Sequence, residues 1–243
     1  MSGSSPAQQY YDGAPAEFRR APGRRAGPPR YNPGVRETFI TFEGIEGSGK
    51  STQVALLVRF LSAGGADVVT TREPGGTRLG ERVRDILLDP ASDPVPLSEL
   101  FLLEAARAQL VSRVIAPALA AGRVVVSDRF ADSSSAYQGT ARALGAGVVA
   151  TLNAAACGEV VPTRTLVLDL DVEVAIARAR ERATTTSDNS RFEDEAMAFH
   201  RRVAAGYREV ARCEPGRVRL VDASGSPEQV HERVLAELAD LLP

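Results

Sequence analysis

Cysteine and tryptophan are almost missing from this chain of 243 residues, which has two cysteines and no tryptophan. The cysteines, Cys157 and Cys213, are too few for a disulfide scaffold and lack the spacing of metal ligands. Free thiols fit a reducing compartment. We therefore expect a cytoplasmic protein without structural disulfides.

Long apolar runs are missing as well. The longest stretch without a charged residue, Ala143 to Gly158, carries Gly, Thr and Asn and falls short of the ~18 residues that a membrane-spanning helix needs. The N-terminus lacks the apolar core of a secretory signal. We therefore expect no association with a membrane.

The net charge is small, at −2, but it is unevenly distributed. Residues 1–36 hold six arginines against Asp12 and Glu17 and are rich in Pro, Gly and Ser. Such a segment buries too little apolar surface to offset the entropy lost on ordering, which predicts a disordered basic tail. Residues 37–243 hold 23 basic and 29 acidic residues, whereas nucleic-acid-binding domains are usually basic. We expect one folded domain over residues 37–243 and no nucleic-acid partner.

Lysine is nearly absent, because 28 of the 29 basic residues are arginine. The single lysine, Lys50, lies in the segment GIEGSGKS, which matches the pattern G-x-x-x-x-G-K-[ST] of a phosphate-binding loop. Glycines there turn successive N–H groups around a phosphate, and the Lys50 ammonium is a compact charge for the β- and γ-phosphates. The Ser51 hydroxyl is a predicted Mg²⁺ ligand. We predict nucleotide binding by Gly44, Ile45, Glu46, Gly47, Ser48, Gly49, Lys50 and Ser51.

Short apolar runs alternate with longer helical ones from Glu37 onward. Several runs show no polar alternation, as expected for a parallel sheet with helices on both faces. We predict strands over Thr38–Phe42, Asp67–Thr71, Arg123–Ser127, Thr165–Leu170 and Val218–Val221. We predict helices near Lys50–Ala63, Leu79–Leu88, Leu97–Ala121, Gly147–Cys157, Val172–Arg182, Glu193–Cys213 and Glu228–Leu242. The predicted fold class is α/β, a doubly wound parallel sheet of five strands flanked by helices.

Charged residues follow two predicted strands at the sheet edge where ligands bind in open α/β folds. Arg72 and Arg129 are suited to grip a phosphate with two hydrogen bonds each, and Asp128 is suited to hold Mg²⁺. An acceptor phosphate, mostly ionised at pH 7 because its second pKa is about 6, needs no general base. We therefore predict catalysis by positioning and expect no role for His200 and His231.

Three further segments, together with the phosphate-binding loop, resemble the bacterial thymidylate kinase family. They are Thr71–Thr77 (TREPGGT), Glu104–Arg107 (EAAR), and Asp128–Phe130 (DRF) with Ser133 and Ala136–Gly139 (AYQG) after it. They stand in the family's order over Phe39 to Pro243. The resemblance implies the nucleoside monophosphate kinase type of P-loop fold. It also implies transfer of the γ-phosphate of ATP to dTMP, giving dTDP, with Mg²⁺ as cofactor and with Lys50 and Arg129 in catalysis.

The resemblance also implies a set of dTMP-binding residues. Arg72 and Arg129 are expected at the phosphate, Arg107 over the pyrimidine ring with a bond to its O4, and Ser134 at the base edge. Gln138 completes the pocket, Tyr137 crowds the sugar C2′ and favours deoxyribose, and Glu46 meets the 3′-hydroxyl. Members usually carry a Phe that stacks on thymine where this chain has Leu103, and stacking is worth about 0.5–1.5 kcal/mol.

A lid is expected near residues 180–192. Arg180 and Arg182 end one predicted helix, a polar stretch follows, and Arg191 opens the next helix. Closure of such a segment keeps water from the phosphoryl group. In some family members a basic residue within the loop stabilises the transition state, but the corresponding position here is Gly47. The resemblance therefore implies that Arg180, Arg182 or Arg191 takes this part.

Two other functions stay open. One is a kinase for another pyrimidine or modified deoxynucleoside monophosphate, to which the departure at Leu103 points. The other is a nucleotide-binding P-loop protein without transfer activity, although a pure binder would need no arginines on the acceptor side. The resemblance also implies a homodimer formed by packed helices, to which the apolar run Leu97–Leu103 is expected to contribute.

Overall fold

The computed structural model describes residues 38–183 and 197–242 of the chain. The predicted tail over residues 1–36 lies outside the described residues, as do Arg191 and most of the predicted lid. Within the described ranges, no helix is both long and apolar enough to cross a membrane.

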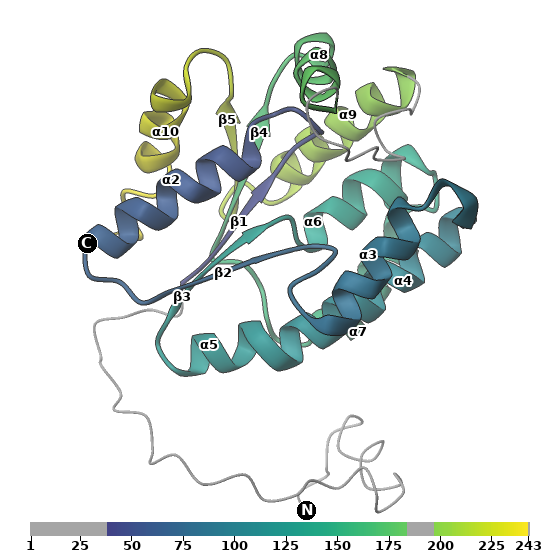
Figure 1. Ribbon diagram of the computed structural model, residues 1–243, viewed down its shortest axis with the longest axis horizontal. Coiled ribbons are helices and arrows are strands. Elements are labelled where there is room, and N and C mark those ends of the chain that lie inside the picture. Colours follow the sequence, from purple (N-terminus) through teal and green to yellow (C-terminus); the bar gives the residue numbers. More distant parts are fainter. Residues whose placement is uncertain (1–37, 184–196, 243) are drawn as a thin grey trace, which may run out of the picture. The chain divides into compact units, whose positions relative to one another are not determined.

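Five parallel strands form one sheet in the order β2-β3-β1-β4-β5 (Figure 1). They are β1 (Phe39–Glu43), β2 (Val68–Arg72), β3 (Val124–Asp128), β4 (Arg164–Asp169) and β5 (Val218–Asp222), each within one residue of its predicted bounds. Every residue of β1 is buried, since helices cover both faces of a central parallel strand. The predicted doubly wound α/β fold is confirmed.

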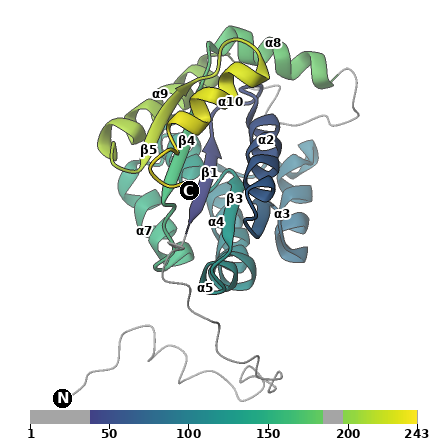
Figure 2. The same cartoon turned by 90° about the vertical axis from the view of Figure 1, so that its left-hand side faces the viewer.

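Helices cover both faces of the sheet (Figures 1 and 2). They are α2 (Lys50–Ala63), α3 (Arg78–Leu88), α4 (Pro96–Leu110), α5 (Ala116–Ala120), α6 (Ala131–Ser134), α7 (Ala146–Cys157), α8 (Val172–Ala183), α9 (Met197–Cys213) and α10 (Pro227–Ala236). Alternate residues of β1 enter different cores. Ile40 and Phe42 share a hydrophobic cluster with Leu57 of α2, whereas Phe39 belongs to a second cluster with Leu110 at the end of α4.

Three helical segments differ from the prediction. The helix expected over Leu97–Ala121 contains a wider π-helical turn, Val111–Ile115, just before Pro117, which has no N–H to continue the α-helical bonds. Residues 131–141 were not predicted as helical but form α6 and a π-helical segment, Ser135–Ala141 (η4). The last helix, α10, ends at Ala236 rather than near Leu242.

The strand register brings the carboxyl ends of β1, β2 and β3 to one edge. Asp128 of β3 is paired with Arg72 of β2 on one side and with Phe42 of β1 on the other. The phosphate-binding loop follows β1 directly, and the N–H of Arg129 donates to the Phe42 carbonyl oxygen at 2.9 Å. The fold thus gathers the predicted loop, Arg72, Asp128 and Arg129 at the edge where ligands bind in this architecture.

Candidate active site

The phosphate-binding loop connects β1 to α2 through backbone conformations that need glycine. Gly44, Gly47 and Gly49 have φ values of 133°, 77° and 95°. At Gly47 the space is closed as well, because an added Cβ would lie 1.8 Å from the carbonyl oxygen of Ala175 in α8. A basic side chain therefore has no place at this position, and a cation for the transferred group must come from elsewhere.

Lys50 begins α2 and its side chain folds back over the loop. Its ammonium donates to the carbonyl oxygens of Ile45 at 2.8 Å and Gly44 at 3.1 Å. Burial and the positive charge of Arg129 together lower the pKa of Lys50 to about 8. A phosphate placed in the loop offers this ammonium the negative partner that the described residues do not provide at hydrogen-bond distance.

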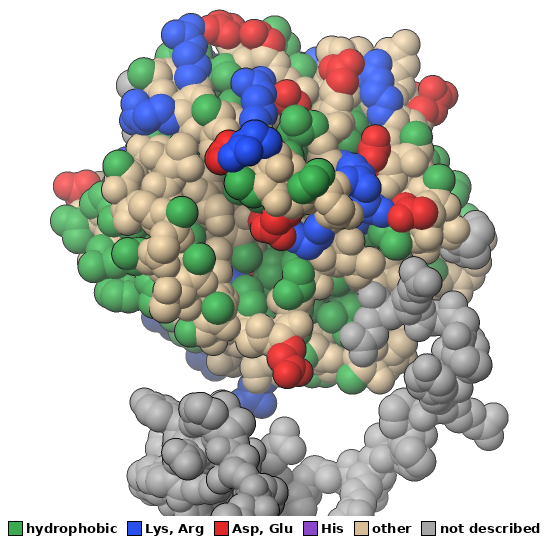
Figure 3. Space-filling view, turned by 180° about the vertical axis from the view of Figure 1, so that it is seen from behind, with side chains coloured by type: hydrophobic (Ala, Val, Ile, Leu, Met, Phe, Trp, Pro, Cys, Tyr) green, Lys and Arg blue, Asp and Glu red, His purple; other side chains and the backbone are tan. Residues whose placement is uncertain are grey.

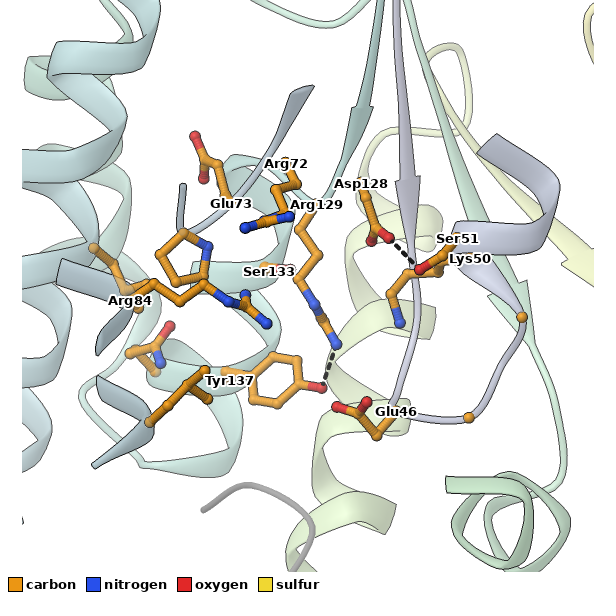
Figure 4. A pocket seen from close by; sticks show the side chains of 16 residues that line it. Glu46, Lys50, Ser51, Arg72, Glu73, Arg84, Asp128, Arg129, Ser133 and Tyr137 are labelled. Carbon is orange, nitrogen blue, oxygen red and sulfur yellow. Dashed lines mark hydrogen bonds between the residues drawn. The ribbon is translucent and has the colours of Figure 1, made fainter. Parts of the chain in front are cut away.

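Ser51 and Asp128 meet across the site. The Ser51 hydroxyl donates to Oδ2 of Asp128 at 2.8 Å (Figure 4). Both offer oxygen ligands, which Mg²⁺ prefers, and a P-loop site usually holds this ion with one or two protein groups and the phosphates. Within the described residues, no cluster of three or more His, Cys, Asp or Glu side chains forms a metal cage. The donor set fits a magnesium ion carried by a nucleotide.

One pocket joins the loop to the acceptor-side residues. Among the predicted site residues, it is lined by Glu46, Gly47, Gly49, Lys50, Ser51, Arg72, Leu103, Asp128, Arg129, Tyr137 and Gln138. Figure 4 shows the Glu46 carboxylate beside the Tyr137 ring, opposite the Asp128–Ser51 pair. Residues that the sequence placed in a donor group and an acceptor group thus line a single pocket.

Arg129 lies at the centre of the pocket in a left-handed backbone conformation, with φ at 73°. Its Nη1 donates to Ser133 Oγ at 3.2 Å and to Tyr207 Oη at 3.0 Å, and its Nη2 donates to Tyr137 Oη at 3.1 Å. Three neutral hydroxyls hold the guanidinium in place without neutralising its charge. Its Nε–H makes no hydrogen bond within the described part of the chain and is left for a ligand.

Two further arginines line the pocket. Arg72 is half exposed and forms an ion pair with Glu81 at 2.8 Å. Arg84 of α3 was missed in the sequence, and Figure 4 shows its guanidinium extending toward Tyr137. Arg84 and Leu88, which also lines the pocket, are one helical turn apart, so the four-residue spacing along α3 was the available signal.

Gln138 has a fixed orientation in the pocket wall. Its Nε2 donates to Oε1 of the buried Glu99 at 2.7 Å, and its own buried Oε1 has no hydrogen-bond partner in the described residues. The nearby Leu103 is half-buried and lines the pocket beside α3, packed against Val83 and Leu87. The wall therefore combines an aliphatic surface with a hydrogen-bond acceptor that awaits a donor.

Arg107 and Ser134 do not line the pocket. Arg107 is 1% exposed, and all five of its N–H groups are engaged, by Glu73, Glu104, Asn153 and the Phe130 carbonyl oxygen. A base O4 would have to replace one of these acceptors. Ser134 is fully buried, and its Oγ has no partner in the described ranges.

The predicted lid arginines lie apart from the pocket or outside the description. Arg180 is exposed on α8 and does not line the pocket. Arg182 lies in the last turn of α8, but its side chain is outside the described part, as is the whole of Arg191. Their catalytic role stays a prediction.

A buried carboxylate beneath Arg129 was also missed. Glu43 ends β1 with no exposed surface and accepts hydrogen bonds from Ser133 and Tyr207. Burial and the nearby negative charge of Asp132 together raise the pKa of Glu43 to about 7. Tyr207 lies in α9, 164 residues further along the chain, so no local sequence pattern predicts its contact with Glu43.

A parallel α/β sheet with a phosphate-binding loop at its carboxyl edge, and acceptor-side arginines in the same pocket, defines a P-loop kinase of the nucleoside monophosphate type. Comparison with known proteins narrows the class. The Thymidylate kinase family profile matches residues 42–234. This chain belongs to the thymidylate kinase family.

Individual relatives are similar over most of the chain. A thymidylate kinase of Cereibacter sphaeroides is 50% identical over 211 residues, covering 86% of this chain and 97% of the relative. A thymidylate kinase of Trichlorobacter lovleyi is 48% identical over 208 residues, covering 83% and 98%. The crystal structure of thymidylate kinase from Ehrlichia chaffeensis superposes with a TM-score of 0.68 at 35% identity, covering 83% of this chain and 98% of that one.

Proposed function

We propose that this chain transfers the γ-phosphate of ATP to dTMP and forms dTDP, a step of dTTP synthesis. The observation that carries the proposal is the shared pocket, in which Lys50 of the loop and the guanidinium groups of Arg72, Arg84 and Arg129 line one space. Cations on both sides bring two polyanions together and hold them in line. Membership of the thymidylate kinase family supports dTMP as the acceptor.

Catalysis rests on positioning. The acceptor phosphate is already a nucleophile at neutral pH, so no general base is needed. Arg129 grips it through the N–H groups that the hydroxyls of Tyr137, Tyr207 and Ser133 leave unused. Arg180, Arg182 and Arg191 are the candidates to stabilise the transferring group from the lid, because Gly47 leaves no room for a basic side chain in the loop.

Ser51 and Asp128 are the proposed holders of Mg²⁺, the cofactor of the reaction. When bound, the ion neutralises negative charge on the β- and γ-phosphates. The hydrogen bond between the two side chains at 2.8 Å keeps both oxygens directed at the same place.

The acceptor base is proposed to lie against Leu103 with its N3–H on Oε1 of Gln138. That oxygen is buried without a partner, and a ring N–H satisfies it. Tyr137 is held by Arg129 and crowds the sugar C2′, and Glu46 beside it meets the 3′-hydroxyl. Arg107 and Ser134 complete the base site only if dTMP binding rearranges the wall around them.

A homodimer is proposed through the outer faces of α4 and α7. Leu97, Phe101 and Val148 are 42%, 52% and 46% exposed, and hydrophobic side chains gather on that side of the molecule (Figure 3). Leu97 and Phe101 share one face of α4 because they are four residues apart. Phe101→Glu is expected to yield a monomer in light scattering, and an unchanged mass would remove this face. The free thiols of Cys157 and Cys213 support a cytoplasmic location.

A panel of monophosphates tests the function. ADP formation is followed in a coupled assay with dTMP, dUMP, dCMP, dGMP and a modified pyrimidine deoxynucleotide as acceptors. The proposal expects turnover selective for dTMP. Faster turnover with another pyrimidine would establish the alternative kinase, and ATP binding without turnover of any acceptor would establish a non-catalytic P-loop protein.

A further inference from the structure

Glu43 is a charged group that the mechanism above does not use. It is fully buried at the end of β1, with Oε1 accepting from the Phe130 N–H at 2.7 Å. Its Oε2 accepts from Ser133 Oγ at 2.6 Å and from Tyr207 Oη at 2.8 Å. A buried carboxylate costs stability unless hydrogen bonds or a charged partner compensate for the lost hydration.

The same two hydroxyls bind Arg129. Each hydroxyl has one proton. When both protons go to Glu43, the 2.9 Å contact between the Ser133 and Tyr207 oxygens holds no proton, and their lone pairs face Nη1 of Arg129, 3.2 Å from Ser133 and 3.0 Å from Tyr207. Glu43 thus fixes the polarity of both bonds. If Glu43 were a donor instead, a hydroxyl proton could turn toward the guanidinium N–H and repel it.

We propose that Glu43 is a positioning residue for acceptor binding, which holds the Arg129 guanidinium in its binding orientation through Ser133 and Tyr207. The inference rests on the proposed role of Arg129 at the acceptor phosphate. Glu43 contacts no pocket surface itself, since the pocket is lined by Arg129, Ser133 and Tyr137 above it.

Charged and titratable groups on several neighbouring elements influence the ionisation of Glu43. Asp132 of α6 opposes its ionisation but is itself paired with Arg217 at 2.7 Å. Arg129 favours ionisation, Lys50 of α2 interacts with it across the loop, and burial keeps Tyr207 a neutral donor by raising its pKa well above the usual value. Glu43 therefore changes charge near neutral pH, with a pKa of about 7.

The direction in which Glu43→Gln changes dTMP affinity distinguishes a positioning role from a purely electrostatic one. A negative charge below the acceptor site repels a phosphate dianion, so a purely electrostatic role predicts that Glu43→Gln tightens dTMP binding. A positioning role predicts the reverse, because Gln keeps the volume and the acceptor for Phe130 but presents an amide donor to both hydroxyls.

The test measures Kd for dTMP and for ATP by calorimetry, with KM and kcat alongside. We expect Glu43→Gln to raise Kd and KM for dTMP about tenfold, the loss for a weakened hydrogen bond to a charged group, with the Kd for ATP within about twofold. Tyr207→Phe removes the hydroxyl that links Glu43 to Arg129 and leaves Glu43 in place. This variant is expected to raise the dTMP Kd as well. The fold-loss of dTMP affinity in the double variant should be smaller than the product of the two single fold-losses, because both substitutions act through the same hydrogen bonds to Arg129.

A matched buried carboxylate controls for loosening of the fold. Asp132→Asn removes a 5% exposed acid that pairs with Arg217 and does not touch Arg129. It is expected to lower the unfolding temperature while the dTMP Kd stays within about twofold. An equal rise of the dTMP Kd in Asp132→Asn and Glu43→Gln would overturn the proposal, as would tighter binding by Glu43→Gln. If Glu43→Gln does not fold, an unchanged Kd in Tyr207→Phe overturns it.

Two further readouts complete the design. Arg129→Ala tests the role on which the inference rests: unchanged dTMP binding in that variant overturns the proposed role of Arg129 at the acceptor phosphate. A loss of binding in Arg129→Ala with none in Glu43→Gln overturns the positioning role alone. The pH profile of kcat/KM for dTMP is the second readout. In the wild type, kcat/KM should fall as pH decreases through about 7, where Glu43 is protonated, which is above the pH of about 6 at which the dTMP phosphate is protonated. In Glu43→Gln, only the decrease near pH 6 that comes from the dTMP phosphate should remain. A limb near 7 that persists in Glu43→Gln contradicts the proposal.

Discussion

The orientation of the Gln138 amide yields a prediction about base specificity. Its Nε2 donates to the carboxylate of Glu99, which is 1% exposed, so its Oε1 is left as an acceptor in the pocket wall. Thymine and uracil offer an N3–H to that oxygen. The N3 of cytosine is itself an acceptor, and would meet Gln138 Oε1 with no proton between them.

The structure sets the size of this discrimination. To accept cytosine, the amide must flip, and Oε1 of Gln138 then faces the Glu99 carboxylate at about the distance of the present bond. The flip gives up a hydrogen bond to a charged acceptor, worth about 1.5–3 kcal/mol, or about 10- to 150-fold. Glu99→Gln removes the constraint, because a second amide can either accept or donate. We expect the ratio of kcat/KM for dTMP over dCMP to fall at least about tenfold.

The assay compares dTMP, dCMP and dUMP in the wild type and Glu99→Gln. The substrate dUMP is the matched control, since it shares the N3–H and its ratio to dTMP should stay within about twofold. Thermal unfolding shows whether Glu99→Gln stays folded. This control is needed because the Arg142 guanidinium lies 3.4 Å from Glu99 and loses a charged partner in the variant. An unchanged ratio of dTMP to dCMP in a folded variant would refute the reasoning.

Three other perturbations test parts of the site. Gly47→Ala should lower the unfolding temperature by several degrees and weaken ATP binding, measured by thermal unfolding with and without ATP, because its Cβ meets the Ala175 carbonyl at 1.8 Å; an unshifted transition would contradict the closed geometry. The Kd for ATP in the wild type should rise as pH increases through about 8, since Lys50 loses its proton there, whereas Lys50→Arg should show no such inflection; a flat wild-type titration would count against a charged ammonium at the phosphates. Leu103→Phe should lower the dTMP Kd about two- to tenfold by stacking, in calorimetry, and no gain would mean that the base lies elsewhere.

The sheet and the phosphate loop could be predicted because their signals are local. Buried strands of a parallel sheet are rich in apolar residues and lack a regular polar alternation, and β1 (FITFE) and β4 (RTLVLD) show this pattern in the sequence alone. The loop pattern carries its glycines, Lys50 and Ser51 within eight residues, so its backbone and its chemistry are specified together.

The helical turn after β3 could not be predicted, because its support is tertiary. Residues 131–141 contain three consecutive serines and a glycine, which are poor helix formers. In the structure this segment packs along α9, and Gly206 of α9 lets the two backbones approach, with an added Cβ falling 2.9 Å from Ala136. Burial against α9 outweighs the weak local preference.

On the acceptor side, the sequence predicted which residues lie at the sheet edge but not which side chains they contact. The strand ends placed Arg72, Asp128 and Arg129 correctly at the sheet edge, since the parallel register brings strand ends together. The engagement of Arg107 by Glu73 depends on side chains 34 residues apart, and the Glu43–Tyr207 bond on residues 164 apart. Such pairings depend on the folded register, and a single sequence does not reveal them.

The central claim is that one pocket holds two nucleotides with the acceptor phosphate on Arg129. A crystal structure with a non-hydrolysable ATP analogue, Mg²⁺ and dTMP tests it most directly. The account predicts the dTMP phosphate at hydrogen-bond distance from Arg129 and the thymine N3 beside Gln138 Oε1, with the analogue's phosphates on Lys50. A dTMP molecule bound outside this pocket, with Arg129 still bonded only to Ser133, Tyr137 and Tyr207, would contradict it.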